Sequence, residues 1–395
     1  EQVPFGHPLW VLYSSGTTGL PKAIVHGHGG ILLEHLKKLH LHVDLTPEDK
    51  FFWFTTTGWM MWNFLVSGLL CGSTILTYDG SPAQPDMNAL WRFAQETGMT
   101  VFGTSAGYIT ACMQAGIEPG RDFDLSALKS VGSTGAPLPP EGFDWVYEHV
   151  KGDLWLFSTS GGTDLCTAFV GGCPLLPVRA GELQARALGA KVEAYDEEGN
   201  PLIDEVGELV ITEPMPSMPL YLWNDPDGER YRESYFDKYP GVWRHGDWIK
   251  IKPEGSAAIY GRSDAVINRG GVRMGSAEIY RAVDRVEEVR DSLVVDVQKD
   301  GEDHMPLFVV LQEGAELDED LVNKIKKSIG DTTSPRHVPD EILSVSDVPY
   351  TLNGKKLEVP VKEILSGTPP EEAASKDSLS NPDALDAFIE LADRF

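Results

Sequence analysis

A loop rich in hydroxyl groups and glycines lies near the start of the chain, between two apolar segments. Glycine lets the backbone approach a ligand closely, consecutive N–H groups can surround an anion, and hydroxyl groups add further donors. A lysine at the end of the loop adds a positive charge. These groups suit a polyphosphate, and the candidate phosphate-binding residues are Ser14, Ser15, Gly16, Thr17, Thr18, Gly19 and Lys22.

This loop differs from the Walker loop, because Pro21 stands five residues after Gly16, where Gly-Lys-Ser/Thr would be required. An ordinary polar hairpin loop is the alternative interpretation. Residues 13–26 resemble, almost residue for residue, the Ser/Thr/Gly-rich loop of the adenylate-forming superfamily. That superfamily contains acyl-CoA synthetases, luciferases and the adenylation domains of peptide synthetases. The resemblance therefore implies that the loop binds the phosphates of ATP.

Two segments further along the chain resemble the next superfamily motifs in the required order. Residues 130–137 resemble the turn that packs on adenine, although an ordinary turn would look similar. Residues 158–164 resemble the motif ending in Thr-Glu, whose threonine contacts the α-phosphate and whose acid helps to hold Mg²⁺. Here the motif ends in Thr163-Asp164, so the acidic side chain is shorter. The resemblance adds these nucleotide-binding residues: Gly135, Ala136, Pro137, Ser158, Gly161, Gly162 and Thr163.

Two later motifs are expected to hold the ribose and to connect the domains. Residues 243–247 resemble the motif whose aspartate, here Asp247, accepts hydrogen bonds from both ribose hydroxyls. A carboxylate suits this role because it only accepts hydrogen bonds and can accept two at once. Residues 260–273 resemble the junction motif, in which Arg262 reaches the ribose, Asp264 is the hinge and Arg273 contacts the phosphates. The alternative for each arginine is a surface ion pair.

The last motif, residues 349–356, resembles the Gly-Lys loop whose lysine drives adenylation. By its position Lys355 is that lysine, and its neighbour Lys356 is expected to be a solvated charge. A positive charge is needed because a carboxylate must approach a polyanionic triphosphate. The resemblance implies catalysis by Lys355, Thr163 and Asp164, with ATP, Mg²⁺ and coenzyme A. The acid first forms an acyl-adenylate, and a swing of the small domain about Asp264 then admits the CoA thiol.

The residues of the expected acyl pocket indicate which carboxylic acid is the substrate. Acetate-activating relatives have a tryptophan two residues before the motif threonine, and this chain has Gly161. The expected pocket residues are Trp59, Met60, Met61, Gly135 and Gly161. The resemblance extends over essentially all 395 residues and implies acetoacetate as the substrate. The alternatives are propionate, butyrate or 3-hydroxybutyrate, loading of a carrier-protein thiol, or a nucleotide-binding fragment without catalysis.

Composition limits the class of protein. The net charge of −27 argues against nucleic acid or an anionic membrane surface as a partner. The four cysteines are scattered without a Cys-x-x-Cys pair, which predicts a reduced, cytoplasmic protein. Residues 51–78 carry no charge, but threonines and glycines interrupt them, which favours a buried strand and helix over a membrane span. Five histidines near the start of the chain are expected to lie on the surface or to pack in the interior rather than to form a zinc site: His26, His28, His35, His40 and His42.

Hydrophobic patterns predict the elements that position these motifs. From residue 10 to about 150, short apolar segments alternate with helical ones, which is typical of an α/β fold with a largely parallel sheet. Residues 178–260 carry short alternating strands, which predict a small antiparallel barrel. We expect a large domain over 1–263, whose N-terminal part is missing from this chain, a small, mobile α+β lid domain over 264–367, and a tail over 368–395 that ends in a short helix. Residues 368–380 of this tail are rich in proline, glutamate and serine, which predicts a loose segment.

Overall fold

The computed structural model describes residues 1–14, 22–263, 267–269, 272–299, 302–351, 355–376 and 379–395. The chain divides into two compact units. Unit 1 comprises Glu1–Ser14, Lys22–His245 and Ile249–Ile259, and unit 2 includes Gly246–Trp248 and Tyr260–Phe395. Each unit has hydrophobic clusters of its own.

A parallel sheet forms the centre of unit 1. Its described strands follow the order β4 (Thr74–Leu76), β3 (Lys50–Trp53), β5 (Val101–Ser105), β6 (Ser130–Thr134) and β7 (Trp155–Ser158). Every neighbouring pair in this order is parallel. The helices between these strands make the crossover connections that parallel pairing requires. The predicted α/β fold with a largely parallel sheet is confirmed.

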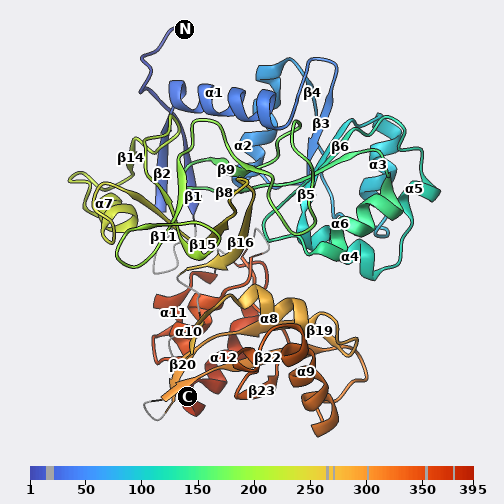
Figure 1. Cartoon of the computed structure of the whole chain (residues 1–395), viewed down its shortest axis with the longest axis vertical. Helices are drawn as coiled ribbons and strands as arrows, with labels where there is room; N and C mark the ends of the chain where they lie inside the picture. Colours follow the sequence, from blue (N-terminus) through green and yellow to red (C-terminus); the bar gives the residue numbers. More distant parts are fainter. Residues whose placement is uncertain (15–21, 264–266, 270–271, 300–301, 352–354, 377–378) are drawn as a thin grey trace. The chain divides into compact units, whose positions relative to one another are not determined.

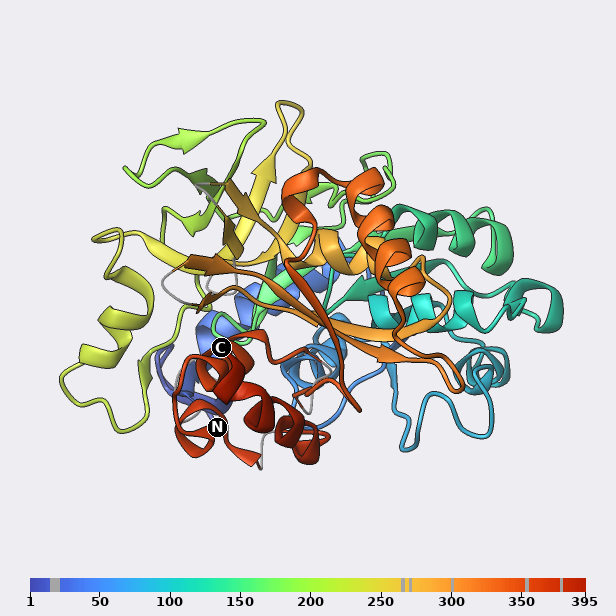
Figure 2. The same cartoon turned by 90° about the horizontal axis from the view of Figure 1, so that it is seen from below.

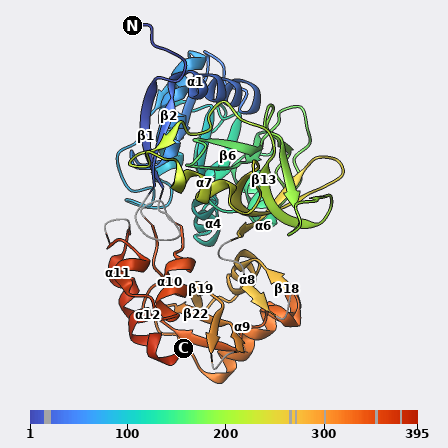
Figure 3. The same ribbon diagram turned by 90° about the vertical axis from the view of Figure 1, so that its left-hand side faces the viewer.

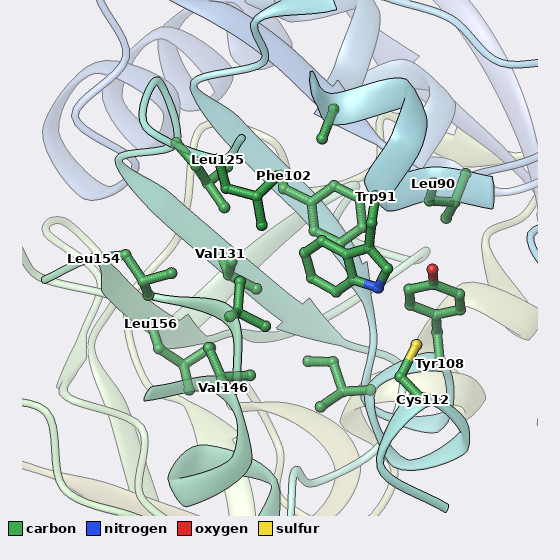
Figure 4. Packing of buried hydrophobic residues seen from close by; sticks show 14 of the residues in the cluster. Leu90, Trp91, Phe102, Tyr108, Cys112, Leu125, Val131, Val146, Leu154 and Leu156 are labelled. Atoms are coloured by element: carbon green, nitrogen blue, oxygen red, sulfur yellow. The ribbon is translucent and has the colours of Figure 1, made fainter. Parts of the chain in front are cut away.

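Helices α3 (Ala89–Thr97), α4 (Ala106–Gln114) and α6 (Pro140–Trp145) lie together beside β5 and β6 (Figure 1). Aromatic and aliphatic side chains from these helices pack on one face of the sheet (Figure 4). The rings of Trp91 and Phe102 stack with their centroids 4.7 Å apart. On the other face, a Cβ atom at Gly103 would lie 2.2 Å from the Trp53 ring, so the indole occupies the space that a side chain at position 103 would need.

Two helices whose sides differ in exposure cover that second face. They are α1 (His28–Lys37), which continues into the π-helical turn η1 (Lys38–His42), and α2 (Met60–Val66), which continues into the 3-10 turn η2 (Ser67–Cys71). Their inward side chains form a cluster with Trp53 and Phe157. On the outward side, large apolar residues stay exposed: Leu32, Leu33, Leu36, Leu69 and Leu70.

Smaller sheets complete unit 1. Strands β1 (Pro8–Ser14) and β2 (Lys22–Gly27) are antiparallel, and β14 (Tyr221–Leu222) pairs with β2. A second sheet has the order β10 (Ala185–Arg186), β9 (Thr167–Gly171), β8 (Ser160–Gly162). The strands expected to form a barrel make a sheet in the order β12 (Pro201–Leu202), β11 (Val192–Tyr195), β13 (Val206–Ile211), β15 (Trp243–Ile251), β16 (Ala257–Arg262). In the described residues its outer strands β12 and β16 are not paired with each other.

The remaining helical segments of unit 1 are short. They are α5 (Pro119–Asp122), the π-helical turn η3 (Val146–Val150) and α7 (Glu229–Phe236). No helix among the described residues is long and apolar enough to cross a membrane.

Unit 2 is built around a three-stranded sheet with helices on both faces. In it β22 (Pro306–Leu311) lies between β19 (Val289–Val294), its antiparallel partner, and β23 (Glu341–Ser344), which is parallel to it. Alternate residues of β22 face opposite clusters, because side chains alternate along a strand. Helices α8 (Ser276–Val283) and α9 (Glu319–Thr332) contribute to one cluster, and α10 (Glu358–Leu365) and α12 (Asp386–Leu391) contribute to the other (Figure 2).

The end of the chain packs on this sheet. Helix α12 lies beside β22 (Figure 3). The buried Phe388 ring of α12 meets the Phe308 ring of β22 edge-on, with centroids 4.9 Å apart. The described residues of 368–380 do not form the loose segment that the composition predicts, because Ala373 of α11 (Pro370–Ala373) is buried and Leu379 is buried as well. The other elements of unit 2 are β17 (Ile267–Arg269), β18 (Val272–Met274), β20 (Val297–Lys299), β21 (Glu302–His304), η4 (Pro335–His337), η6 (Pro382–Leu385) and η7 (Ala392–Arg394).

Candidate nucleotide-binding site

The candidate phosphate loop connects two antiparallel strands of unit 1. Ser14 ends β1, Lys22 begins β2, and the two residues are paired across the hairpin. The Ser14 hydroxyl is buried and has no hydrogen-bond partner among the described residues. The candidates Ser15, Gly16, Thr17, Thr18 and Gly19 lie outside the described residues.

The Thr163–Asp164 turn joins β8 to β9 and brings a carboxylate next to Lys22. The Lys22 Nζ atom lies 2.9 Å from Asp164 Oδ1. The hydroxyl of Tyr235, on α7, donates a hydrogen bond of 2.5 Å to the same oxygen. Burial alone would raise the pKa of Asp164, but the Lys22 charge and the Tyr235 hydrogen bond outweigh it and hold that pKa well below its usual range. Asp164 is therefore ionised at neutral pH.

The chemistry of this turn suits magnesium. Oδ1 of Asp164 accepts both bonds just described, and none of the described residues bonds to Oδ2. In the described part of the chain, no group of three or more His, Cys, Asp or Glu side chains could hold a metal. Mg²⁺ typically takes one or two carboxylates together with substrate phosphates and water, so a single carboxylate with an available oxygen fits it.

Two buried histidines lie next to the Thr163–Asp164 turn. His26 is fully buried, and its Nδ1 atom donates to the Ser217 carbonyl at 3.0 Å. His35 is fully buried as well, with Nε2 2.6 Å from the Cys166 carbonyl oxygen. Burial lowers the pKa of His26 to about 4 and also lowers that of His35. Both rings are therefore neutral, and His35 holds Cys166, whose φ of 50° lies in the left-handed region.

This histidine burial predicts a loss of stability in mild acid. The unfolded chain protonates His26 near pH 6.5, whereas the folded chain does so only near pH 4. Between these values the unfolded state binds more protons, so stability falls as the pH falls, by at most about 1.4 kcal/mol per pH unit for each such histidine. Urea unfolding at pH 7.5, 6.0 and 5.0 measures this slope. His26→Asn, which keeps a donor for the Ser217 carbonyl, should reduce the slope, and a slope unchanged by it would contradict the prediction.

The adenine and phosphate motifs meet at the carboxyl ends of β6 and β7, where open parallel sheets bind ligands. Gly135, Ala136 and Pro137 follow β6 and are exposed, and Gly135 has φ of 90°. Ser158 ends β7 and pairs with Ser133 of β6. The connection between β7 and β8 is fixed by a hydrogen bond of 2.9 Å from the Thr134 hydroxyl to the Thr159 carbonyl.

The expected acyl-pocket residues have different degrees of burial. Met60 and Met61 are buried at the start of α2, and Trp59 is half-buried against the same cluster. The backbone also favours glycine at position 161, because a Cβ atom there would lie 2.0 Å from the Thr167 carbonyl oxygen. The β8–β9 register is irregular at this point. A contribution of these residues to an acyl pocket stays a prediction.

We expect Gly161→Ala to destabilise unit 1. The new methyl group meets backbone rather than a side chain that could turn away, so β8 must shift at a cost of roughly 1–3 kcal/mol. Gly152→Ala is the matched control, since its Cβ atom would lie 3.6 Å from the nearest atom. Chemical denaturation of the two variants compares the free energies of unfolding. Equal values for both variants would show that the backbone approach at Gly161 is not tight.

The candidate ribose residues lie together on neighbouring strands. Asp247 on β15 and Arg262 on β16 form an ion pair, with 3.8 Å between Oδ1 and Nη1. The Ser263 N–H donates to the Gly246 carbonyl at 2.8 Å and fixes the chain just after Arg262. The predicted hinge Asp264 lies outside the described residues. Arg273 belongs to β18, where its backbone pairs with Asn268.

The two C-terminal lysines differ in environment. Lys355 is exposed, and a hydrogen bond of 2.8 Å from the Thr351 N–H to its carbonyl holds its backbone. Lys356 pairs with Asp291 at 2.7 Å, and its Nζ atom lies 4.1 Å from the centroid of the Tyr280 ring. The expectation that Lys356 is a solvated charge is therefore wrong. A catalytic role for Lys355 stays a prediction.

Sequence reasoning missed Tyr235, which contacts both Lys22 and Asp164. The Lys22 Nζ atom lies 4.6 Å from the centroid of its ring, and its hydroxyl bonds to Asp164. Tyr235 is 71 residues from Asp164 in a segment without a recognised motif, so no local pattern pointed to it.

Comparisons with known proteins are consistent with this geometry. A family model described as AMP-binding enzyme matches residues 2–222. Acetoacetyl-coenzyme A synthetase of Rhizobium meliloti is 49% identical over 391 residues, which cover 99% of this chain and 60% of that protein. Acetoacetyl-CoA synthetase of Gallus gallus is 46% identical over 390 residues, 98% of this chain and 58% of that protein. The chain thus spans about 60% of the length of these relatives.

Two solved structures resemble the fold. Acetoacetyl-CoA synthetase from Streptomyces lividans has a TM-score of 0.94 and 59% identity, covering 100% of this chain and 60% of that one. An anthranilate CoA ligase in complex with anthranoyl-AMP has a TM-score of 0.74, and the match covers 89% of this chain and 66% of the ligase chain. At 20% identity this second likeness concerns the fold alone.

Proposed function

The chain belongs to the AMP-binding enzyme family, and on that premise we propose that it is an ATP-dependent ligase that joins acetoacetate to coenzyme A. The observation that carries the proposal is the 59% identity and TM-score of 0.94 over the whole chain with an acetoacetyl-CoA synthetase. The Lys22–Asp164 pair beside the candidate phosphate loop supports it, because it places one cation and one carboxylate where a metal-bound triphosphate needs both.

In the proposed first step, a carboxylate oxygen of acetoacetate attacks the α-phosphorus of ATP, the bond to the bridging oxygen breaks, and pyrophosphate leaves. Lys22 and the Thr163 hydroxyl bind phosphate oxygens, and Asp247 accepts hydrogen bonds from the ribose hydroxyls. Lys355 lies between the incoming carboxylate and the α-phosphate and offsets their repulsion. Mg²⁺, held by Asp164 with the phosphates, would neutralise the triphosphate charge.

In the proposed second step, the thiol sulfur of coenzyme A attacks the acyl carbon of the adenylate, and AMP leaves. Unit 2 carries Lys355 and would withdraw it by rotation about Asp264, with domains over 1–263 and 264–367. Such closure and opening of a small domain is common in enzymes that protect a reactive intermediate. A cytoplasmic location goes with this proposal.

Pyrophosphate release tests the function. The chain is incubated with ATP and Mg²⁺ and with acetate, propionate, butyrate, 3-hydroxybutyrate or acetoacetate, with and without coenzyme A. We expect acetoacetate to give the fastest release and coenzyme A to increase it. Faster release with another acid would keep the reaction and overturn the substrate. ATP binding without acid-dependent release would support a nucleotide-binding fragment instead.

A further inference from the structure

Resting on the proposed function, we propose that Tyr235 is a positioning residue. It holds Oδ1 of Asp164 so that Oδ2 is presented to the metal-bound nucleotide. Tyr235 lies on α7, which follows β14, the strand that pairs with β2 (Figure 1). It belongs to none of the segments that resemble a superfamily motif.

The hydrogen-bond pattern on Asp164 carries this inference. Both Lys22 and Tyr235 contact Oδ1, at 2.9 and 2.5 Å, and no described residue bonds to Oδ2. The two contacts therefore fix the rotation of the carboxylate group, with one oxygen held and the other available. Carboxylate groups on otherwise mobile side chains gain metal affinity when a neighbouring hydrogen bond orients them.

The tyrosine itself is rigid. Its side chain is buried, and its ring stacks on the Trp243 indole with centroids 3.8 Å apart and planes at 13°. This stack fixes the ring plane and hence the position of the hydroxyl. A rigid donor is important here because aspartate is one methylene shorter than the glutamate of the family motif, so its carboxylate has less reach to correct a misorientation.

Tyr235 also differs from Lys22 in what nucleotide binding does to it. Lys22 contacts Asp164 through its charge, and a triphosphate offers that charge a competing partner. When Lys22 moves to the phosphates, the Tyr235 hydrogen bond becomes the contact that keeps Oδ1 in place. The phenol is neutral and buried, so it is not drawn to the phosphates. Asp164 then keeps its orientation throughout the exchange.

The test is ATP binding by isothermal titration calorimetry, with excess EDTA and with saturating Mg²⁺. Tyr235→Phe removes the hydroxyl and keeps the ring that stacks on Trp243. Tyr231→Phe is the matched control, because Tyr231 lies on the same helix and packs edge-on to Trp243, while its hydroxyl faces the Pro219 carbonyl. Thermal melting of both variants checks that the fold is kept.

We expect Tyr235→Phe to weaken ATP binding about tenfold in Mg²⁺ and to leave it unchanged in EDTA, because only the metal-dependent part of the affinity requires an oriented carboxylate. Tyr231→Phe should match the unsubstituted chain in both buffers. A loss by Tyr235→Phe in both buffers, or in neither, would overturn the positioning role. If the unsubstituted chain binds no ATP in either buffer, the proposed function fails, and this inference fails with it.

Discussion

Lys355→Gln is expected to lower acid-dependent pyrophosphate release by about 10³-fold, the upper range for loss of one group that stabilises developing charge. Glutamine keeps much of the length of lysine and removes its charge. The lysine is exposed, so the substitution should leave the unfolding midpoint unchanged. ATP binding in the absence of acid should also persist. Pyrophosphate release and a melting curve on the same preparation measure both effects.

Lys356→Gln is the matched control, and it should give the opposite result. It removes an ion pair to Asp291 and a contact with the Tyr280 ring, so it destabilises unit 2. At a temperature where the variant stays folded, release should remain within a few-fold of normal. Normal release by Lys355→Gln together with a large loss in Lys356→Gln would transfer the catalytic role to Lys356.

Asp164→Asn is expected to reduce pyrophosphate release by at least 100-fold. The substitution removes the charge that would hold Mg²⁺, and loss of even an indirect metal contact typically costs 10–100-fold in affinity. It also leaves the half-buried ammonium of Lys22 without its carboxylate partner at 2.9 Å. Release measured over a range of Mg²⁺ concentrations should show that added metal does not restore the rate.

Asp164→Glu controls for charge. Glutamate is the residue of the family motif, so this variant should retain release within about tenfold of the unsubstituted chain. If Asp164→Asn were as active as Asp164→Glu, the negative charge would be unnecessary and the metal role of this residue would be contradicted.

The elements that could be predicted from sequence are those with strong local patterns. Short apolar segments that alternate with helical ones predicted the strands found as β3, β5 and β6 and the helices found as α3 and α6. Glycine-rich and hydroxyl-rich segments predicted the turns after β6 and β7, because turn chemistry is local. The resemblance to a known family indicated Lys22 and Asp164 as separate site residues, but their ion pair was not predicted, since 141 residues separate the two positions.

The remaining features depend on long-range packing. Tyr235 orients Asp164 only because α7 and the Thr163–Asp164 turn meet in space. Lys356 looked like a surface charge because Asp291 and Tyr280 are distant in sequence. The composition of residues 368–380 suggested a loose tail, yet a few apolar residues suffice to dock it when the sheet offers Phe308 and Val310. Gly161 was related to the substrate, and the close approach of the Thr167 carbonyl oxygen in this chain is a second reason for a glycine there.

The outward leucines of α1 and η2 have a consequence for handling the protein. Leu33 and Leu69 are 55% and 58% exposed. Because α1 and η2 pack against each other, these leucines form an exposed hydrophobic surface. The net charge of −27 keeps copies apart in dilute buffer. Near 0.1 M salt that repulsion is screened beyond about 10 Å, and leucine faces can then meet. Colloidal stability should therefore be best at low ionic strength, the reverse of the usual remedy for precipitation.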